Sequence, residues 1–396
     1  MRTLLLAALA VLLGPGLAAQ SVPARGADDT FDVAAWNMEH FGNPSEGPTN
    51  DPLQLRNAEA IIAGAEIDVW AVQEVGDQQA WSDLLASLAD DGYTGRLGPT
   101  VPGSFQLRLG FIYNPSVVQV IGTRTILSGG NFGGRAPFEM QATVRVDGES
   151  RSVRIISLHA KAGTQSDDYT DRQNGAEALK AYIDDRVALG EDVILMGDFN
   201  DFLTRSIRIG QPSPYLVFTN DTAGYVAATL PVENRGEPTL CNNATCTSGS
   251  TRDHILFTSG LADEYVDDSG DRFIEVVDGV PGYVTTTSDH LPVLARFSFR
   301  TTSAEGDRDG RAARLLATAP NPSRGAARLR FRLDAPADVR LDVVDALGRI
   351  VASVSGAYGP GTHAVALDGA ALAPGAYTVR LSAGGALDVG RLVRVR

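Results

Sequence analysis

Residues 193–201 read V-I-L-M-G-D-F-N-D. Four apolar residues lead into a glycine, and Asp198, Asn200 and Asp201 follow at once. A short run that is apolar on both faces predicts a strand buried between layers. Because residues two apart on a strand share a face, Asp198 and Asn200 should point together while Phe199 packs the other way. The stretch therefore predicts a buried strand that delivers a carboxylate and an amide to one place.

The remaining polar position and the glycine of this stretch have expected roles of their own. Gly197 should let the backbone turn at the strand end without a side-chain clash. Asp201 lies on the face opposite to Asp198 and is expected to be a bystander that caps a turn or a helix. On this interpretation, Asp201→Asn costs only a modest amount of stability.

Other stretches of residues 31–300 can be placed in the same way. Several apolar runs predict strands that sit between layers rather than at a wet surface. Apolar residues at helical spacing predict two long helices. The predicted strands are 31–36, 68–72, 107–113 and 152–158, and the predicted helices are 52–65 and 169–187.

Polar side chains follow four of these predicted strands and precede two later ones. If the two later strands run antiparallel to the first four, all six tips meet at one rim, where ligands are commonly bound. The candidate site residues are Asn37, Glu74, His159, Asp198, Asn200, Asp253, Asp289 and His290. A single aspartate after a strand is often only a turn former, and His254 could simply pack in its strand.

The chemistry of this set favours a metal-assisted reaction. Crowded carboxylates repel one another unless a hard divalent cation compensates, and oxygen ligands suit magnesium. We therefore expect Mg²⁺, with Mn²⁺ or Ca²⁺ as alternatives. Two histidines among carboxylates suit acid–base work or a hydrogen bond to a phosphoryl oxygen. Since no serine or cysteine occupies an obvious nucleophile motif, an activated water is the expected attacker.

The whole chain sets further bounds. Its 396 residues suggest more than one domain, and its formal net charge of −14 counts against easy binding of a nucleic acid backbone. Residues 1–20 have a basic start, a short apolar run and small residues, which predicts a secretory signal peptide. Export favours a disulfide between Cys241 and Cys246. No later segment is long and apolar enough to predict a stable membrane span.

The sequence pattern changes after residue 300. Residues 301–315 are polar and without an apolar period, so they predict a linker after a catalytic domain at 21–300. Residues 316–396 contain short stretches of period-two alternation separated by glycine and proline. This pattern predicts a small C-terminal all-β sandwich.

Six ordered motifs resemble the endonuclease/exonuclease/phosphatase family: W-N-M-E-H-F, V-Q-E-V, S-L-H-A-K-A-G, M-G-D-F-N-D, R-D-H-I-L-F and S-D-H-L-P-V. The resemblance implies an α/β fold, a four-layer sandwich of two mixed β-sheets flanked by helices. The C-terminal A-P-N-P-S-R-G and L-A-P-G-A-Y-T-V-R-L resemble the sorting domain of the type IX secretion system. That likeness implies export through the type IX machinery and removal of the domain. A sandwich that binds carbohydrate or a partner is the alternative.

The family resemblance implies roles for the residues nearest the metal and the water. Glu74 is the expected metal ligand, supported by Asn37, with Asp289 close to the metal. Asp198 is expected to orient or deprotonate the attacking water. Asn200 is expected to hydrogen-bond the phosphate.

The same resemblance implies roles for the histidines and one arginine. His159 should contact the scissile phosphate, and Asp253 should orient His290. Arg135, in G-G-R-A-P-F, is expected either beside the substrate backbone or in a loop salt bridge. Some relatives pair the first histidine with a glutamate, but the corresponding stretch here, 104–108, has no acid, so the partner of His159 stays open.

These observations favour a secreted phosphodiesterase, a nuclease of low sequence specificity that acts on DNA or RNA. The alternatives are a phosphatase or a sphingomyelinase-like phospholipase C of the same fold, and, less favoured, a non-catalytic surface-binding module. Arginines such as Arg135 and Arg172 are expected to supply a local basic patch. The sequence does not distinguish endo- from exonucleolytic action or one metal from two, and it does not indicate an oligomeric state.

Overall fold

A computed structural model describes residues 22–100, 107–128, 130–299, 313–319, 323, 327–333, 335–345, 348–367 and 372–395. The expected signal peptide, residues 1–20, lies outside these residues, and so do residues 301–312 of the expected linker. Within the described ranges, no helix has both the length and the apolar character needed to span a bilayer.

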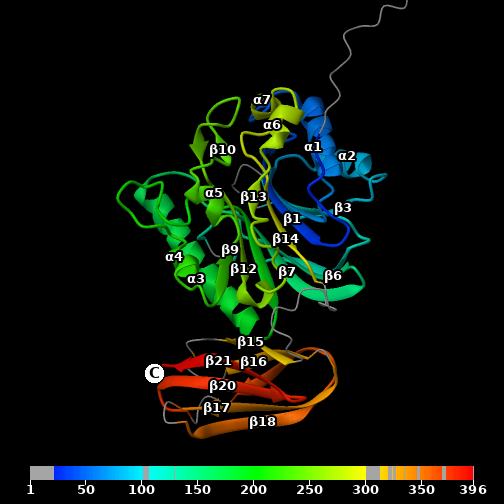
Figure 1. Ribbon diagram of the computed structural model, residues 1–396. Helices are drawn as coiled ribbons and strands as arrows, with labels where there is room; N and C mark the ends of the chain where they lie inside the picture. Colours follow the sequence, from blue (N-terminus) through cyan, green and yellow to red (C-terminus); the bar gives the residue numbers. More distant parts are fainter. Residues whose placement is uncertain are drawn as a thin grey trace, which may run out of the picture.

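Two six-stranded mixed sheets form the centre of the larger, N-terminal region (Figure 1). The first sheet, in spatial order, contains β13 (Asp271–Arg272), β14 (Val293–Phe297), β1 (Phe31–Phe41), β2 (Val69–Val75), β4 (Arg108–Tyr113) and β3 (Thr94–Leu97). The second contains β5 (Val118–Thr125), β6 (Phe138–Val146), β7 (Glu149–His159), β8 (Asp192–Asp198), β12 (Asp253–Thr258) and β9 (Tyr225–Ala227).

Helices cover the outer face of each sheet. Those packed on the first sheet are α1 (Asp51–Ala65), α2 (Gln78–Ser87), α6 (Glu275–Gly279) and α7 (Tyr283–Thr286). Those packed on the second are α3 (Ser166–Ala188) and α4 (Leu216–Thr219). Short elements complete the region: α5 (Leu230–Asn234), β10 (Leu240–Cys241), β11 (Gly249–Ser250) and a 3-10 turn at Ser259–Leu261.

Three apolar clusters account for the layers. Along β1, Val33 and Ala35 face the second sheet, whereas Ala34 and Trp36 face the helices, as the period of two requires. The cluster between the sheets joins β1 to residues such as Met196 of β8. Because both faces of each sheet are covered, the central strands carry apolar residues on both faces. The four-layer α/β fold expected from the sequence is confirmed.

Strand directions decide where the polar strand ends meet. β1 runs parallel to β2, and β7 runs parallel to β8. β12 is antiparallel to β8, and β14 is antiparallel to β1. The C-terminal ends of β1, β2, β7 and β8 therefore lie at the same rim as the N-terminal ends of β12 and β14. The sequence predicted that all six strand tips would meet if the two later strands ran antiparallel to the other four, and they do.

The C-terminal domain is all β, as expected. One antiparallel sheet contains β15 (Ala313–Ala319), β16 (Ala327–Leu333) and β19 (Gly361–Leu367). The other contains β18 (Ile350–Tyr358), β17 (Ala337–Val344), β20 (Gly375–Ala383) and β21 (Ala386–Arg394). β15 begins inside the stretch expected to be linker and pairs with β16. The expected limits of the linker and of the domains, 21–300 and 316–396, stay predictions.

The C-terminal domain contacts the larger region at one end of β8. Arg330 Nη1 of β16 lies 3.0 Å from Asp192 Oδ1, and Arg314 Nη2 of β15 lies 3.6 Å from Asp263 Oδ1. Asp192 is the first residue of β8, whereas Asp198 is the last. The contact is therefore at the end of β8 opposite to the polar rim.

The two cysteines form the disulfide that the sequence predicted. Cys241 and Cys246 are joined, with their Cα atoms 4.7 Å apart. The Cys241 amide donates a hydrogen bond to the Asp289 carbonyl, at 2.7 Å. The closed loop therefore supports the backbone just before His290.

Candidate active site

Irregular backbone aims several side chains at the rim. The register between β1 and β2 shifts after Asn37, and the register between β2 and β4 shifts around Glu74. Glu39, His40, Glu74 and Asn200 have φ of 45°, 51°, 61° and 52°, in the left-handed region that residues other than glycine seldom adopt. Bulges and strained residues of this kind gather at functional sites, where they redirect side chains.

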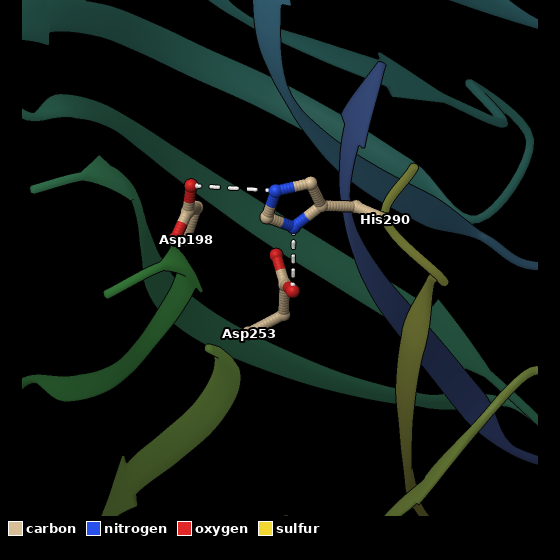
Figure 2. Close-up of side chains that lie close together, drawn as sticks. All are labelled: Asp198, Asp253 and His290. Carbon is tan, nitrogen blue, oxygen red and sulfur yellow. Dashed lines mark hydrogen bonds and ion pairs between the residues drawn. The ribbon is translucent and has the colours of Figure 1, made fainter. Parts of the chain in front are cut away.

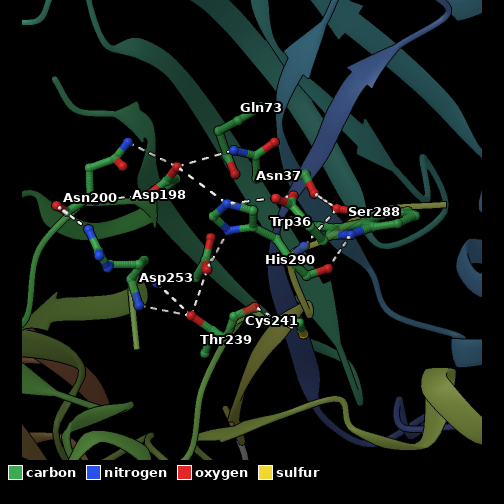
Figure 3. Close-up of polar contacts among 12 residues, drawn as sticks. Trp36, Asn37, Gln73, Asp198, Asn200, Thr239, Cys241, Asp253, Ser288 and His290 are labelled. Carbon is green, nitrogen blue, oxygen red and sulfur yellow. Dashed lines mark hydrogen bonds and ion pairs between the residues drawn. The ribbon is translucent and has the colours of Figure 1, made fainter. Parts of the chain in front are cut away.

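The Asp198 carboxylate is at the centre of the cluster (Figure 3). Its Oδ2 accepts hydrogen bonds from Asn37 Nδ2 and Asn200 Nδ2, both at 3.1 Å. Its Oδ1 accepts from the Asn200 amide at 2.8 Å. His159 Nε2 and His290 Nε2 lie 3.6 Å and 4.0 Å from Oδ2. The tips of β1, β7, β8 and the segment before β14 thus meet at one carboxylate.

The environment of Asp198 favours its protonated form more than water does. Burial raises the pKa of Asp198 to about 6; the neighbouring Asp253 and Glu74 add to this shift, while His290 opposes it. A carboxylate with a pKa in this range can take a proton near neutral pH and release it again. The physical properties of Asp198 therefore suit a general base.

His290 and Asp253 form a tight pair (Figure 2). His290 Nδ1 lies 2.8 Å from Asp253 Oδ2, which also accepts from Thr239 Oγ1 at 2.7 Å. Burial alone would lower the pKa of His290, but Asp253, followed by Asp198 and Asp289, raises it well above its usual value. Asp253 therefore favours the protonated form of His290, whose Nε2 side faces Asp198.

His159 has the opposite character. It is buried, and burial lowers its pKa well below the usual value, with the charges of Arg135 and His290 adding to the effect. Its Nε2 lies 3.5 Å from Glu74 Oε1, and its Nδ1 has no hydrogen-bond partner among the described residues. Residues 104–106, from the stretch where relatives carry an acid, lie outside those residues. The environment of His159 thus favours the neutral imidazole, whereas that of His290 favours the protonated one.

Carboxylates crowd around Glu74 and Asp289. Asn37 Nδ2 donates to Glu74 Oε1 at 3.0 Å, and Glu39 Oε2 accepts from the Asp289 amide at 2.8 Å. Burial raises the pKa of Asp289, and Glu74 adds to the shift. Burial, followed by the charge of Asp289, raises the pKa of Glu39 to about 7. A divalent cation with oxygen ligands would relieve this repulsion, so the donor set fits the expected metal.

A second group of possible ligands overlaps the first. Donor atoms of Asp198, Asp253 and His290 all lie within 4.8 Å of one another. However, Asp253 Oδ2 is already hydrogen-bonded to His290 Nδ1, and it accepts a second hydrogen bond from Thr239 Oγ1. For this reason the carboxylates around Glu74 are the better donors for a cation, and the Asp253–His290 pair is better suited to acid–base chemistry.

The local geometry after β8 corrects two expectations. β8 ends at Asp198, and Asn200 is left-handed rather than extended, so the two side chains meet through a turn and not through strand alternation. Gly197 lies inside the strand with a φ of 144°. A Cβ there would lie 2.0 Å from the Leu158 carbonyl oxygen of β7. The glycine is therefore required by close strand approach, not by a turn.

The expectation that Arg172 lies on the surface is wrong, and Asp201 has an ion pair that its expected role as a bystander did not include. Arg172 is buried and ion-paired with Asp201 at 2.9 Å, so it contributes nothing to a surface patch. Asp201 does cap a turn, since its carboxylate accepts from the amides of Phe202 and Ile207. Yet a substitution that leaves Arg172 buried without its partner should cost far more than a modest amount of stability.

Arg135 and His254 are placed clearly. Arg135 Nη2 donates to the Ala160 carbonyl at 2.9 Å, and no described carboxylate lies within ion-pair distance of it. The loop salt bridge considered for Arg135 is thus not found among the described residues. His254 is buried, with Nε2 3.1 Å from the Asp201 carbonyl oxygen, and packs edge-on to Phe199. His254 therefore packs in its strand, which is the structural role that the sequence allowed for it.

Comparison with known proteins agrees with this geometry. Residues 34–290 match the profile described as "Endonuclease/Exonuclease/phosphatase family". The chain belongs to this family. Members of the endonuclease/exonuclease/phosphatase family are metal-dependent phosphoesterases and nucleases. Residues 318–394 match the "Secretion system C-terminal sorting domain", the type IX sorting domain, which indicates secretion or cell-surface attachment.

Solved structures share the family fold. The 3′ phosphatase NExo from Neisseria, bound to a product DNA hairpin, is 16% identical, with a TM-score of 0.51 over 68% of this chain and 100% of that chain. An endonuclease/exonuclease/phosphatase from Beutenbergia cavernae DSM 12333 is 17% identical, with a TM-score of 0.49 over 92% of this chain and 100% of that one. Such low identity shows the fold alone. No protein with a curated description matches the chain.

Sequence reasoning missed several residues that build this family site. Thr239 orients Asp253, and no motif marks it. Ser288 Oγ donates to the Asn37 carbonyl at 2.7 Å, and its position next to Asp289 in the last motif was a usable signal. Glu39 was also missed, although it lies two positions after Asn37 in the first motif.

Proposed function

We propose that the protein is a secreted, divalent-metal-dependent phosphodiesterase that hydrolyses DNA or RNA with little sequence specificity. The observation that carries this proposal is the meeting of two unlike histidines at one buried carboxylate. Asp198 Oδ2 lies 3.6 Å from Nε2 of His159, whose pKa is lowered, and 4.0 Å from Nε2 of His290, whose pKa is raised. A base beside one neutral and one cationic imidazole suits attack by water on a phosphate ester.

Each residue has a role in this proposal. Asp198 takes the proton of the attacking water, and Asn200 binds a phosphoryl oxygen. His290, kept protonated by Asp253, donates to a phosphoryl oxygen as negative charge develops there. His159, whose lowered pKa makes it a poor proton acceptor, contacts the same phosphate.

The residues around Glu74 would hold the cation, with Asn37 and Asp289 beside it. Mg²⁺ is the expected ion, and Mn²⁺ or Ca²⁺ are alternatives. When bound, a divalent cation polarises the phosphoryl oxygen and offsets its charge. Arg135 is proposed to lie beside the substrate backbone, since its guanidinium has no carboxylate partner among the described residues.

Nucleic acid is the proposed substrate for two reasons. The Neisseria structure of the same fold holds DNA, and the sorting domain indicates an extracellular setting, where long phosphodiesters occur. That same relative is a 3′ phosphatase, so a phosphatase is the second candidate. A phospholipase C of the sphingomyelinase kind is a third. A non-catalytic module is disfavoured because all six strand tips carry reactive groups.

One comparison of substrates tests the proposal. The full chain is incubated with supercoiled plasmid, RNA, sphingomyelin vesicles and sugar phosphates, with Mg²⁺ and with EDTA. We expect cleavage of plasmid or RNA that EDTA stops and that Asp198→Asn abolishes. Hydrolysis of sphingomyelin or a phosphomonoester, with both nucleic acids left intact, would instead establish one of the alternatives.

A further inference from the structure

The loop after β8, residues 202–212, is rigidly built beside the candidate active site. The Asp201 carboxylate accepts hydrogen bonds from the Ser206 hydroxyl at 2.8 Å and the Ile207 amide at 2.6 Å. The two arms of the loop pair through an antiparallel bridge between Arg205 and Pro212. The 202–212 loop is therefore a fixed projection, held by the residue that follows Asn200.

The surface of this loop combines an apolar tip with arginines. Ile209 is 97% exposed, more than any other large apolar side chain that the structure describes. Arg205 is exposed, and the centre of its guanidinium lies 3.8 Å from the centroid of the Phe202 ring. Arg252 lies 5.9 Å from the same ring. A guanidinium stacked on an aromatic ring keeps its N–H edge available for an anion.

These arginines lack a close carboxylate partner among the described residues, although Asp198, Asp201 and Asp253 act on Arg252 from a longer distance. Among the described residues, no carboxylate lies within 4.0 Å of the guanidinium of Arg205, Arg208 or Arg252. The charge of Arg172, by contrast, is neutralised by its buried ion pair with Asp201. In a chain with a net charge of −14, the 202–212 loop contains two arginines and no acidic residue.

The loop is connected directly to the strand tips. Arg252 Nη1 donates to the Asn200 carbonyl at 3.0 Å, and Arg208 Nη1 donates to the Thr164 carbonyl, in the segment after β7, at 2.9 Å. Arg205 is five residues beyond Asn200, which places its Cα at most about 18 Å away. One nucleotide advances a strand by about 3.4 Å in a duplex, so this upper limit corresponds to at most about five nucleotides.

We propose that the 202–212 loop binds the sugar–phosphate backbone next to the scissile phosphate, with Arg205 and Arg208 on phosphates and Ile209 against a base or sugar face. This inference rests on the proposed nuclease function and deepens it. A single exposed isoleucine is common on protein surfaces. On a rigid loop that also carries two arginines without a close carboxylate partner, however, it combines the cations that bind phosphates with an apolar side chain that can contact a base.

An anionic membrane is the competing partner for a basic loop with an apolar tip. Binding to a membrane surface grows with the apolar area that is inserted. Here that area is one isoleucine, because the Phe202 ring is covered by Arg205 and Arg252. The small area favours a strand of nucleic acid over a lipid surface.

Three variants of the full chain test the inference: Arg205→Gln combined with Arg208→Gln, Ile209→Ser, and the matched control Arg145→Gln. Arg145 is exposed and pairs with Ser150, at the end of the β6–β7 ladder opposite to His159. Hydrolysis of a 40-nucleotide DNA is compared with hydrolysis of bis(p-nitrophenyl) phosphate. Binding of a labelled oligonucleotide is measured in EDTA over a range of salt concentrations.

We expect the double arginine variant to lose about tenfold more kcat/KM on DNA than on the small diester. Its plot of log Kd against log salt should lose about one unit of slope for each arginine. Ile209→Ser should weaken oligonucleotide binding and leave the slope unchanged, because it removes no charge. Arg145→Gln should behave as the wild type.

Several results would overturn the inference. Equal losses on both substrates, or an unchanged salt slope, would exclude phosphate contacts by the loop. Binding to phosphatidylglycerol vesicles that Ile209→Ser abolishes, with DNA kinetics unaltered, would assign the loop to a membrane instead. Failure of the wild type to cleave any nucleic acid would refute the proposed function. Oligonucleotide binding that is unchanged in the double arginine variant would refute the proposed role of the loop.

Discussion

Arg172 and Asp201 form an ion pair from which solvent is excluded: Nε lies 2.9 Å from Oδ2, and both side chains are 0% exposed. Arg172 Nη1 also donates to the carbonyls of Lys161 and Gly163, each at 2.8 Å. The pair therefore joins the segment that follows His159, the last residue of β7, to the segment that follows Asp198, the last residue of β8. Asp201 holds the rim in place, while Asp198, three residues earlier, faces the reactive cluster.

The first prediction separates these two aspartates. Asp198→Asn keeps the shape of the site and removes a base, so turnover should fall by about 10²–10⁴-fold while the fold is retained. Asp201→Asn leaves Arg172 buried without its partner, so the free energy of unfolding should fall by about 3 kcal/mol or more. Turnover at saturating Mg²⁺ and chemical denaturation of both variants measure the two effects.

A double variant controls the second half of that prediction. Arg172→Met removes the orphaned charge, so Asp201→Asn with Arg172→Met should be more stable than Asp201→Asn alone. A stable, active Asp198→Asn together with a catalytically dead but stable Asp201→Asn would contradict both assignments.

The second prediction concerns pH. If His290 must be protonated to act, activity is present below its pKa and is lost as the pH rises through it. Burial lowers that pKa, but Asp253 contributes the largest opposing effect and raises it. Asp253→Asn should therefore move the alkaline limb of kcat/KM to lower pH. Thr239→Val, which keeps the Asp253 charge, should shift the limb much less, and an unmoved limb in Asp253→Asn would exclude a protonated His290.

The third prediction concerns the metal. EDTA should abolish hydrolysis and added Mg²⁺ should restore it, because crowded carboxylates around Glu74 need a cation to compensate them. Glu74→Gln should need a higher Mg²⁺ concentration for half-maximal activity. Activity assays over a Mg²⁺ titration measure both effects, and full activity after exhaustive chelation would rule out a metal mechanism.

The fourth prediction concerns the C-terminal domain. Asp192, which pairs with Arg330, and Asp198 are the two ends of β8, about 20 Å apart at the usual rise of a strand. Removal of the C-terminal domain should therefore leave kcat within about twofold. In the producing cell, mass spectrometry should find the released form ending near 301–316. A released protein that still ends at Arg396 would contradict processing of the sorting domain.

The fifth prediction concerns the disulfide. Labelling of the mature protein under denaturing, non-reducing conditions should find no free thiol, since Cys241 and Cys246 are joined. The bond closes a loop with a sequence separation of 5, so Cys241→Ala with Cys246→Ala should lower stability by about 2 kcal/mol on the chain-entropy estimate. Thermal unfolding with and without reductant measures the loss, and an unchanged Tm would exclude it.

Local patterns in the sequence were enough to predict the strands that carry the site residues, the two long helices and the polar residue at each of those strand tips. Burial on both faces follows from a run of apolar residues, and a period of two or 3.6 depends only on near neighbours. Six ordered motifs then predicted the family and the residues Asn37, Glu74, His159 and Asp198 at one rim. The strand directions that bring them together agree with that expectation.

The tertiary structure alone decided which charges are paired and which are free. Arg172 was expected on the surface and is instead buried against Asp201, 29 residues away in the sequence. Arg205 and Arg252 came to lie beside one aromatic ring although 47 positions separate them. The electrostatic state of a side chain depends on burial and on neighbours brought near by the fold, and a local pattern carries no record of those distant partners.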